Sequence, residues 1–426
     1  MKALFFLRHY NDIDHVTPII SEWQTRGHDA DVVLLGPVAT LTDYRIKYLA
    51  GLERVSVAHL QEVLGFWQHA YYRLLTRLVT HRARSTFHRL LLRICGGKEP
   101  KRQSFWRSLS ARLLDRTFKH SEKVGVLAFD WVSRDTGVAM EWVREIVELA
   151  HARNISAFSL PHGDSPHANK MIRRSELSPA ADTTFANADV FDVVAVPNAL
   201  CAERFTPHLP AERIAVLGSP RYCDGWLSKL PALMPPTSLT RRSEKLHVVM
   251  FLRKSNFTSF WEEIALVARM LAGMPDVQII IKEHTRSGWK QPLARDSALK
   301  SLRQVCIVGD EVHSAHLLDW ADIVIDIATS VSFEAVKRGI PVLAADYLHA
   351  GLSTVGRYIP GTVMHCRDDV WHAVERLRTD GAAGFYDNND RELFIAEIID
   401  GPEPDVLAGY VRLLESQPTF LRESLA

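Results

Sequence analysis

The chain of 426 residues has little cysteine and no long hydrophobic run. Its five cysteines form no CxxC pair and no Cys/His cluster, which excludes a disulfide scaffold and argues against a structural zinc site. No segment approaches the roughly 18 consecutive apolar residues that a membrane-spanning helix needs. The apolar start, Ala3–Leu7, runs directly into Arg8, so it is too short for a signal peptide and predicts a first strand. These absences predict a cytoplasmic protein.

The chain also lacks an overall excess of charge, but its charges are unevenly distributed. Fifty-one Lys and Arg against 50 Asp and Glu give a net charge of +1, which argues against a general nucleic-acid-binding protein. Residues 71–120 alone contain 13 Lys and Arg and only two acids, Glu99 and Asp115. Two interpretations remain open. The segment lies on an anionic membrane surface, in peripheral contact with the inner face of the cytoplasmic membrane, or it is a solvated helical pair whose apolar stripe packs on the N-terminal domain.

Short apolar runs alternate with helical patterns along most of the chain, which predicts an α/β fold with parallel sheets. The expected strands are 2–7, 31–35, 124–129, 155–160, 193–196, 214–217, 247–252, 277–281, 305–308, 323–325 and 341–344. Between them, residues 231–245 are rich in proline and polar side chains and predict a linker. We therefore expect an N-terminal Rossmann-like domain over 1–235 with a basic helical insertion at about 63–120, a C-terminal Rossmann-like domain over 246–390, and closing helices over 391–426.

The motifs of common nucleotide enzymes are missing. Neither half contains GxGxxG or a P-loop, which makes dehydrogenase and kinase activities poor candidates. Ligands of open α/β sheets bind at the carboxyl ends of strands, so polar residues that follow predicted strands are the candidates. His162, beside Gly163, could act as an acid or base near neutral pH, or it could be an ordinary loop histidine. Asp14 and Asp130 could serve as a general base for an acceptor hydroxyl. Asp14, like the nearby Asp12, could equally cap the following helix.

Further along the chain, three polar segments suit a phosphate. Lys282, Glu283 and His284 end one predicted strand, and the hydroxyl-rich turn from Thr329 leads into a helix whose free N–H groups favour an anion. Ser and Thr also cap helices without any ligand, so that interpretation stays open. The candidate donor-binding residues are Gly163, Arg221, Lys254, Lys282, Glu283, His284, Thr329, Ser330, Ser332 and Glu334.

Four of these elements, in this order over residues 120–345, resemble GT-B glycosyltransferases of bacterial surface polysaccharides. They are His162-Gly163, the segment 218–221 (GSPR), His284, and the segment 329–335 (TSVSFEA). The likeness is to the group that contains CDP-glycerol glycerophosphotransferases and the Kdo-type transferases of capsule, O-antigen and lipopolysaccharide synthesis. In that group the second motif is usually His-Pro, whereas here Thr285 follows His284.

The resemblance implies two domains facing a cleft, with the N-terminal one for the acceptor and the C-terminal one for a nucleotide donor. It implies that His162 and His284 lie near the donor phosphates and that Ser330 and Ser332 grip a phosphate. The implied reaction moves a sugar or a polyol phosphate from a nucleotide-activated donor, preferably a cytidine nucleotide, to a hydroxyl of a glycan or glycolipid acceptor. No DxD motif follows a convincing strand end, so we expect no metal and no other cofactor. The alternatives are a non-hydrolysing UDP-N-acetylglucosamine 2-epimerase and a catalytically inactive GT-B binding subunit.

Overall fold

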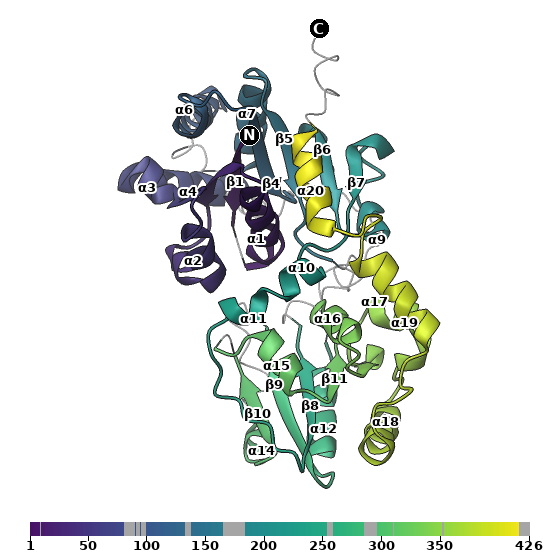
Figure 1. Cartoon of the computed structure of the whole chain (residues 1–426). Helices are drawn as coiled ribbons and strands as arrows, with labels where there is room; N and C mark the ends of the chain where they lie inside the picture. Colours follow the sequence, from purple (N-terminus) through teal and green to yellow (C-terminus); the bar gives the residue numbers. More distant parts are fainter. Residues whose placement is uncertain are drawn as a thin grey trace. The chain divides into compact units, whose positions relative to one another are not determined.

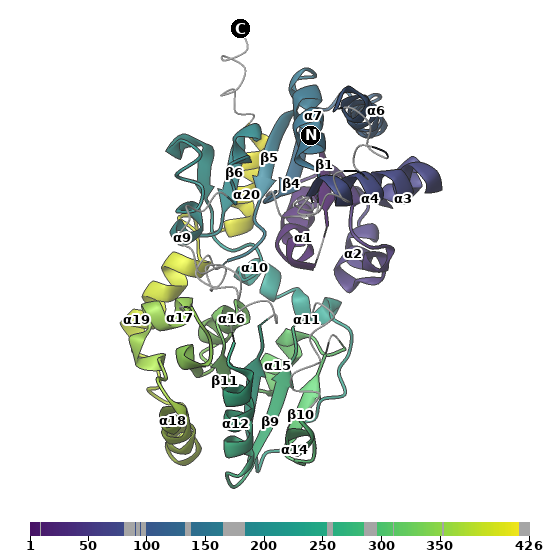
Figure 2. The same cartoon turned by 180° about the vertical axis from the view of Figure 1, so that it is seen from behind.

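Two parallel α/β units make up the chain in the computed structural model (Figures 1 and 2). The structure describes residues 1–8, 10–80, 90, 94, 99–132, 138–164, 184–253, 259–284, 296–309, 311–351 and 353–416. Within these ranges, 1–164, 184–233 and 400–416 form the first unit, and 234–399 form the second. The boundary at 233/234 falls inside the proline-rich segment 231–245. The segment 391–426 is divided, because its residues up to Ile399 belong to the second unit and the helix after Asp400 belongs to the first.

The first unit is built on a seven-stranded parallel sheet in the order β3-β2-β1-β4-β5-β6-β7. The bounds of its strands are β1 Lys2–Leu7, β2 Asp29–Leu34, β3 Val55–His59, β4 Gly125–Asp130, β5 Ser156–Leu160, β6 Val193–Val196 and β7 Ile214–Val216. Most of these strands are almost continuously apolar, since a parallel sheet covered on both faces buries both sets of side chains. The strand order reverses direction between β1 and β4, which are paired in register from Lys2 with Gly125 to Phe6 with Phe129.

Helices cover both faces of this sheet. Phe6 and Phe129 pack against Trp142 of α7 (Met140–His151), and the same apolar cluster takes in Tyr72 of α4 (Phe66–Thr80) and Trp106 of α6 (Glu99–Phe118). On the other face, α1 (Tyr10–Thr25) packs against α20 (Val406–Glu415), as Figures 1 and 2 show. The remaining helical segments of this unit are η1 Val38–Thr42, α2 Tyr44–Ala50, α3 Leu60–Leu64, η3 Ala188–Val190, α9 Ala199–Ala202, η4 Ala211–Arg213, α10 Asp224–Leu227 and α11 Leu230–Leu233.

Two elements of the first unit differ from the sequence-based expectation: β3 (Val55–His59) is not among the expected strands, and α1 begins earlier than expected. The polar run from Arg8 to His15 predicts a loop, but α1 already begins at Tyr10. Asp12 lies in the first turn of this helix, where its carboxylate accepts a hydrogen bond from the backbone N–H of Arg8. This bond satisfies an N–H group at the helix start and favours an acid there. Asp12 and Asp14 therefore lie inside the helix, and neither is its N-cap residue.

The second unit has a five-stranded parallel sheet in the order β10-β9-β8-β11-β12. Its strands are β8 Leu246–Phe251, β9 Val277–Lys282, β10 Val305–Val308, β11 Ile323–Asp326 and β12 Val342–Ala344. Here the order reverses between β8 and β11, which are paired from Val248 with Ile323 to Phe251 with Asp326. Its helical segments are α12 Trp261–Ala272, α14 Ser297–Lys300, α15 Ser314–Trp320, α16 Val331–Lys337, η5 Asp346–Leu348, α17 Thr354–Tyr358, η6 Pro360–Thr362, α18 Arg367–Asp380, α19 Asn388–Phe394 and η7 Ile395–Ile399.

The expected helical insertion over 63–120 consists of α3, α4 and α6 where the structure describes it, and most of the residues between 80 and 99 lie outside the described ranges. Among the described residues, no helix combines the length and the hydrophobicity needed to cross a bilayer.

Candidate functional site

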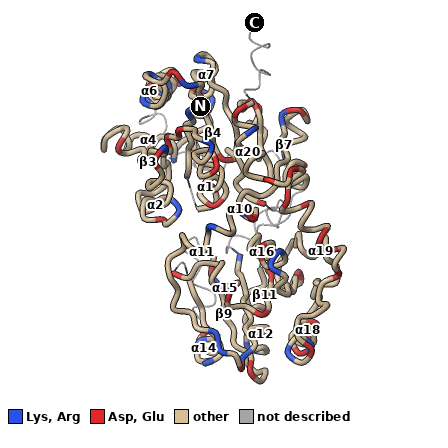
Figure 3. The backbone as a smooth tube through the Cα atoms, viewed as in Figure 1, with Lys and Arg blue, Asp and Glu red and all other residues tan. Residues whose placement is uncertain are grey.

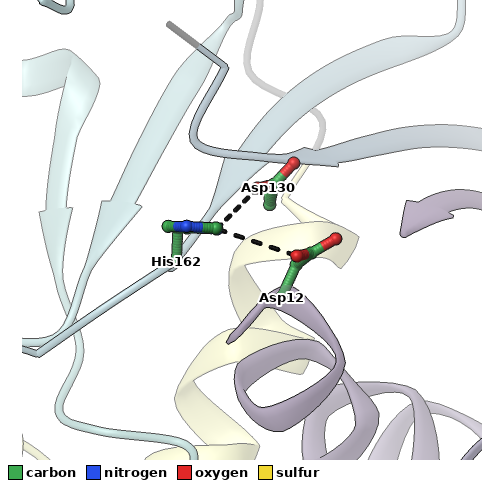
Figure 4. Close-up of side chains that lie close together, drawn as sticks. All are labelled: Asp12, Asp130 and His162. Carbon is green, nitrogen blue, oxygen red and sulfur yellow. Dashed lines mark ion pairs between the residues drawn. The ribbon is translucent and has the colours of Figure 1, made fainter. Parts of the chain in front are cut away.

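Three titratable side chains lie close together at the carboxyl edge of the first sheet, where the strand order reverses between β1 and β4. Asp12 comes from the first turn of α1, Asp130 ends β4, and His162 follows β5 (Figure 4). Nδ1 of His162 lies 2.8 Å from Oδ2 of Asp130 and 3.8 Å from Oδ1 of Asp12. Open α/β sheets bind their ligands at such a reversal of strand order. The two sequence candidates His162 and Asp130 are thus brought together, and Asp12 joins them.

Arg8, which no sequence pattern singled out, holds the Asp130 carboxylate from the other side. Its Nε lies 2.7 Å from Oδ1 of Asp130, and its terminal nitrogen NH2 forms an ion pair with Oδ2. Both side chains are buried. The position of Arg8 immediately after the first strand was the only signal in the sequence. That position indicates a contact with Asp130 only once the pairing of β1 with β4 is known.

The pKa values of the two carboxyl groups of the site are shifted in opposite directions. Burial raises the pKa of Asp12 to about 6, and the neighbouring Asp130 charge raises it as well, whereas the charges of Arg8 and His162 act to lower it. Burial would also raise the pKa of Asp130, but Arg8 and His162 together hold it below its ordinary value. Environments that separate two carboxyl pKa values in this way divide their roles, leaving one group ionised and letting the other exchange a proton near neutral pH.

The side chain of His162 is partly exposed to solvent. A quarter of its side chain is exposed (26%), whereas its Nδ1 atom is buried. The exposed fraction therefore belongs to other atoms of the side chain, and Nδ1 is the ring nitrogen that faces the carboxylates.

A second histidine–carboxylate pair lies close to the first. Nε2 of His15, on α1, is 3.3 Å from Oδ2 of Asp164, and both side chains are buried. Burial raises the pKa of Asp164 to about 6, against the opposing effects of Ser219 and Arg221. Burial lowers the pKa of His15 well below its ordinary value, and the charges of Arg221 and His162 lower it further. His15 follows Asp12 by one helical turn, so a helical reading of residues 10–25 could have found it.

Asp14, expected as a catalytic base, is instead enclosed by arginines. It forms an ion pair with Arg45 of α2, and its Oδ2 lies 3.6 Å from NH1 of Arg221. Arg45 is also bound by Asp43, and burial lowers the pKa of Arg45 to about 9. A carboxylate held by two guanidinium groups is a poor proton acceptor, and the role of Asp14 as a base remains a prediction.

Gly163 and Gly218 serve different purposes. Among the described residues, a methyl group added at Gly163 would meet no atom within 4 Å, so their packing does not require a glycine there. Gly218 has a φ of +90°, and an added Cβ would lie 2.6 Å from the backbone nitrogen of Gly401. Its carbonyl also accepts a hydrogen bond of 2.8 Å from the Tyr410 hydroxyl of α20. The motif at 218–221 therefore anchors the C-terminal helix, in addition to presenting Arg221.

In the second unit, one expected donor-binding residue, Thr329, contacts Asp326, which ends β11. Its Oδ1 accepts hydrogen bonds from N (2.7 Å) and Oγ1 (3.1 Å) of Thr329, and its Oδ2 accepts one from Oγ of Ser353 (3.0 Å). Burial raises the pKa of Asp326. Arg253 follows β8 at the strand reversal, where burial lowers its pKa to about 10 against the charge of Asp326. Ser330 is half-buried and makes no side-chain cap on α16.

Several of these expected donor-binding side chains are turned into the protein. Ser332 is fully buried, and its Oγ donates a hydrogen bond to the Thr329 carbonyl (2.5 Å). Glu334 is buried in an ion pair with Arg338. Their hydroxyl and carboxylate groups thus make contacts within α16 and the turn before it, and the phosphate contact expected of Ser332 remains a prediction.

The strand-end motif after β9 is also partly buried. The Lys282 ammonium is buried and donates a hydrogen bond to the Gly309 carbonyl, and Glu283 is buried beside it, while His284 is half-buried. Lys254, expected beside them, lies outside the described residues.

The three residues at the edge of the first sheet could also be considered as metal ligands. One ligand atom from each of Asp12, Asp130 and His162 lies within 4.8 Å of the others. The Arg8 guanidinium, however, already binds both oxygens of Asp130 and supplies the positive charge that a cation would bring. The expectation of a metal-independent site remains a prediction, with this internal cation as its physical reason.

No family model matches the chain, and no curated protein sequence matches it. Solved structures do resemble it over nearly its whole length. The UDP-GlcNAc 2-epimerase from Neisseria meningitidis bound to UDP-GlcNAc has a TM-score of 0.58 at 13% identity, covering 98% of this chain and 99% of that one. A glycosyltransferase from Rickettsia africae has a TM-score of 0.54 at 12% identity, covering 99% and 98%.

An Anabaena protein in complex with UDP and glucose has a TM-score of 0.52 at 13% identity, covering 98% of this chain and 99% of that one. At such low identity these resemblances bear on the fold alone. They agree with the two parallel sheets described above, and the chain therefore has the two-unit, GT-B-like α/β fold that glycosyltransferases and UDP-GlcNAc 2-epimerases share.

Proposed function

We propose that this protein is a glycosyltransferase that moves a sugar or a polyol phosphate from a nucleotide-activated donor to a hydroxyl group of a glycan. The observation that carries the proposal is the contact between His162 and Asp130 at the carboxyl edge of the first sheet, with Nδ1 and Oδ2 2.8 Å apart. A carboxylate that holds one nitrogen of an imidazole leaves the other nitrogen free to take a proton from a hydroxyl.

In this proposal Nε2 of His162 accepts the proton of the acceptor hydroxyl. The hydroxyl oxygen attacks the donor as the bond to the nucleotide phosphate breaks, and the phosphate oxygen keeps the electron pair. Asp130, whose Oδ2 lies 2.8 Å from Nδ1, stabilises the imidazolium that forms. Because Arg8 holds Asp130 ionised, the carboxylate can perform this role over a wide pH range.

Asp12 is the second carboxyl group within reach of the imidazole. Its Oδ1 lies 3.8 Å from Nδ1 of His162, and its pKa is raised to about 6. When His162 becomes positively charged, the ionised form of Asp12 is favoured, because an opposite charge at this distance stabilises it. Asp12 therefore adjusts its protonation to the charge that develops on the base.

For the donor, we propose the carboxyl edge of the second sheet. Arg253, Thr329 and Ser330 are the groups there whose chemistry suits a diphosphate, and stabilisation of the leaving nucleotide would come from arginine and backbone N–H groups. The resemblance at the sequence level favours a cytidine nucleotide. The solved structures with UDP or a UDP-sugar bound make a uridine nucleotide the second candidate.

The alternative is epimerisation of a UDP-sugar, favoured by the several UDP-GlcNAc 2-epimerases among the similar solved structures. The same imidazole and carboxyl groups could remove a proton from carbon and return it. An inactive binding subunit is less well supported, because such a protein would have no use for a buried, ion-paired carboxylate beside an open imidazole.

The first test is a thermal-shift comparison of CMP, CDP, UDP and GDP with the full chain. The correct nucleotide stabilises the folded state by RT ln(1 + [L]/Kd), about 2.7 kcal/mol at a hundredfold excess over Kd. UDP-GlcNAc is then incubated alone with the protein and followed by proton NMR. Formation of the C2 epimer without any acceptor would overturn the transferase proposal, and failure of all four nucleotides to stabilise the protein would favour the inactive subunit.

A further inference from the structure

The basic helices α4 and α6 use only part of their surface to pack on the first unit. Tyr72 and Leu75 of α4 and Trp106, Leu109 and Leu113 of α6 are buried in the core beneath the sheet. The solvated helical pair expected from the sequence therefore accounts for these residues. It does not account for the apolar side chains that remain outside.

At the start of α4, two aromatic rings project into solvent. Phe66 is 64% exposed and Trp67 is 82% exposed, and their rings meet edge to face with centroids 5.2 Å apart. Leu74, seven residues after Trp67, is 40% exposed and continues the same side of the helix. Large aromatic groups exposed together in this way mark an interaction surface more often than an ordinary solvated one.

A row of cations lies next to these rings. Arg112, Arg116 and Lys119 are exposed along α6 at helical spacing and line one surface hollow, and Figure 3 marks the Lys and Arg positions of this helix. NH1 of Arg112 donates a hydrogen bond of 2.6 Å to Oε1 of Gln68, the neighbour of Trp67. The acid in the row, Asp115, is bound by Arg153 at 2.7 Å.

The two helices also meet through Tyr71 and Phe105, whose rings lie 4.9 Å apart. We call the exposed rings and cations of these two packed helices the basic–aromatic surface: Phe66, Trp67, Leu74, Arg112, Arg116 and Lys119.

We propose that the basic–aromatic surface docks this protein on an anionic phospholipid membrane. Its cations complement the negative headgroups, and each Lys or Arg near such a surface strengthens binding about fivefold. Trp and Phe rings insert at the level of the headgroups, where an apolar ring and a polar neighbourhood are both satisfied. Since the chain outside residues 71–120 carries about −10 in formal charge, the attraction is local and orients the first unit with this surface toward the membrane.

The test is sedimentation of the full chain with phosphatidylcholine vesicles, with and without phosphatidylserine. We expect binding only to the vesicles that contain phosphatidylserine, and weaker binding as salt is raised. The double variant Arg116→Gln/Lys119→Gln should weaken binding about 30-fold, the product of two removed charges. Trp67→Ser should also weaken binding, and it should abolish the blue shift of tryptophan fluorescence that accompanies insertion of a ring.

The matched controls lie on the second unit. Lys300→Gln/Arg376→Gln removes two exposed cations from α14 and α18, and Trp371→Ser removes a tryptophan that is 38% exposed. These controls should bind vesicles like the unaltered chain, and thermal unfolding of every variant verifies its fold.

Three results would overturn the proposal. The first is that the protein does not sediment with phosphatidylserine vesicles at low salt. The second is that the control variants lose as much vesicle binding as the surface variants. The third is that Trp67→Ser weakens self-association or oligonucleotide binding but leaves vesicle binding unchanged. All of these measurements are made without a nucleotide or an acceptor. The membrane-docking proposal can therefore be overturned while the proposed transfer reaction holds, and the transfer reaction can be overturned while membrane docking holds.

Discussion

The imidazole Nδ1 of His162 lies 2.8 Å from Oδ2 of Asp130, a carboxylate that is buried and bound by Arg8 on its other side. The series of contacts Arg8–Asp130–His162 links a buried cation to a partly exposed imidazole through one carboxylate. Each member should therefore affect a different property when it is changed.

Replacing His162 with Asn should reduce turnover of the donor by about 10²–10⁴-fold, the usual contribution of a general base. Nucleotide-dependent stabilisation should change little, because the donor groups proposed above lie on the second unit. The control is His151→Asn, since Nε2 of His151 is 3.1 Å from Oδ2 of Asp192 in a similar pair outside the site. Steady-state kinetics together with thermal shift separate the two effects. Equal losses in both variants would argue against His162 as the base.

Replacing Asp130 with Asn should lower the free energy of unfolding by about 3–5 kcal/mol, because a buried arginine would lose its counter-charge. The control is Asp115→Asn, which breaks an exposed pair with Arg153 and should cost at most about 1 kcal/mol. Urea unfolding measures both. The Asp130 pKa is depressed in the folded state, so its stabilisation is complete above the unfolded carboxyl pKa, about 3.9, and is lost as pH falls below that value. A variant as stable as the unaltered chain at pH 7 would contradict this account.

Replacing Asp164 with Asn should stabilise the protein at pH 8. The pKa of Asp164 is raised to about 6 in the folded state, so folding becomes less favourable as pH rises from about 4 through 6. The substitution removes the cost of burying that charge, and we expect a gain of about 1–3 kcal/mol at pH 8 and little change at pH 4. Urea unfolding at the two pH values provides the measurement. A loss of stability at pH 8 would mean that the pair with His15 favours the ionised carboxylate.

The two glycines that border the site should respond differently to alanine. In Gly218→Ala, a residue with a side chain would have to adopt a positive φ, and its Cβ would lie 2.6 Å from the backbone of Gly401. The free energy of unfolding should therefore fall by at least about 2 kcal/mol. Gly163→Ala meets open space and should change stability by less than about 0.5 kcal/mol. If the backbone at Gly163 approaches a ligand, this variant should nevertheless weaken ligand binding. Thermal unfolding and nucleotide titration distinguish these outcomes.

Divalent cations should not stabilise the unaltered protein. Arg8 occupies both oxygens of Asp130, so Mg²⁺, Mn²⁺ or Zn²⁺ would have to displace a buried guanidinium. Thermal unfolding with each ion and with EDTA tests this expectation, and Arg8→Gln serves as the comparison because it frees the carboxylate. Stoichiometric binding of one ion to the unaltered chain, lost in His162→Asn, would show that the three residues form a metal site.

Most of the strands follow from the sequence. The runs at 2–7, 193–196 and 305–308 coincide with β1, β6 and β10, and the other expected strands differ from the structure by one or two residues at their ends. Only β3 (Val55–His59), among the strands that the structure describes, has no expected counterpart. Buried parallel strands are short, nearly continuous apolar runs, and this local property is legible without any contact information. The same holds for His162 and Asp130, because polar residues directly after such runs lie at the carboxyl edge of a sheet.

What the sequence could not determine was which strand ends meet. Arg8 and Asp130 are 122 residues apart, and only the order of the strands makes them neighbours. The burial of Ser332 could not be predicted for a related reason, since its place in a hydroxyl-rich turn does not reveal that its side chain points inward. Local pattern thus determined the strands and the residues at their ends. The tertiary structure decided their partners, because ion pairing and burial depend on contacts between residues far apart in the chain.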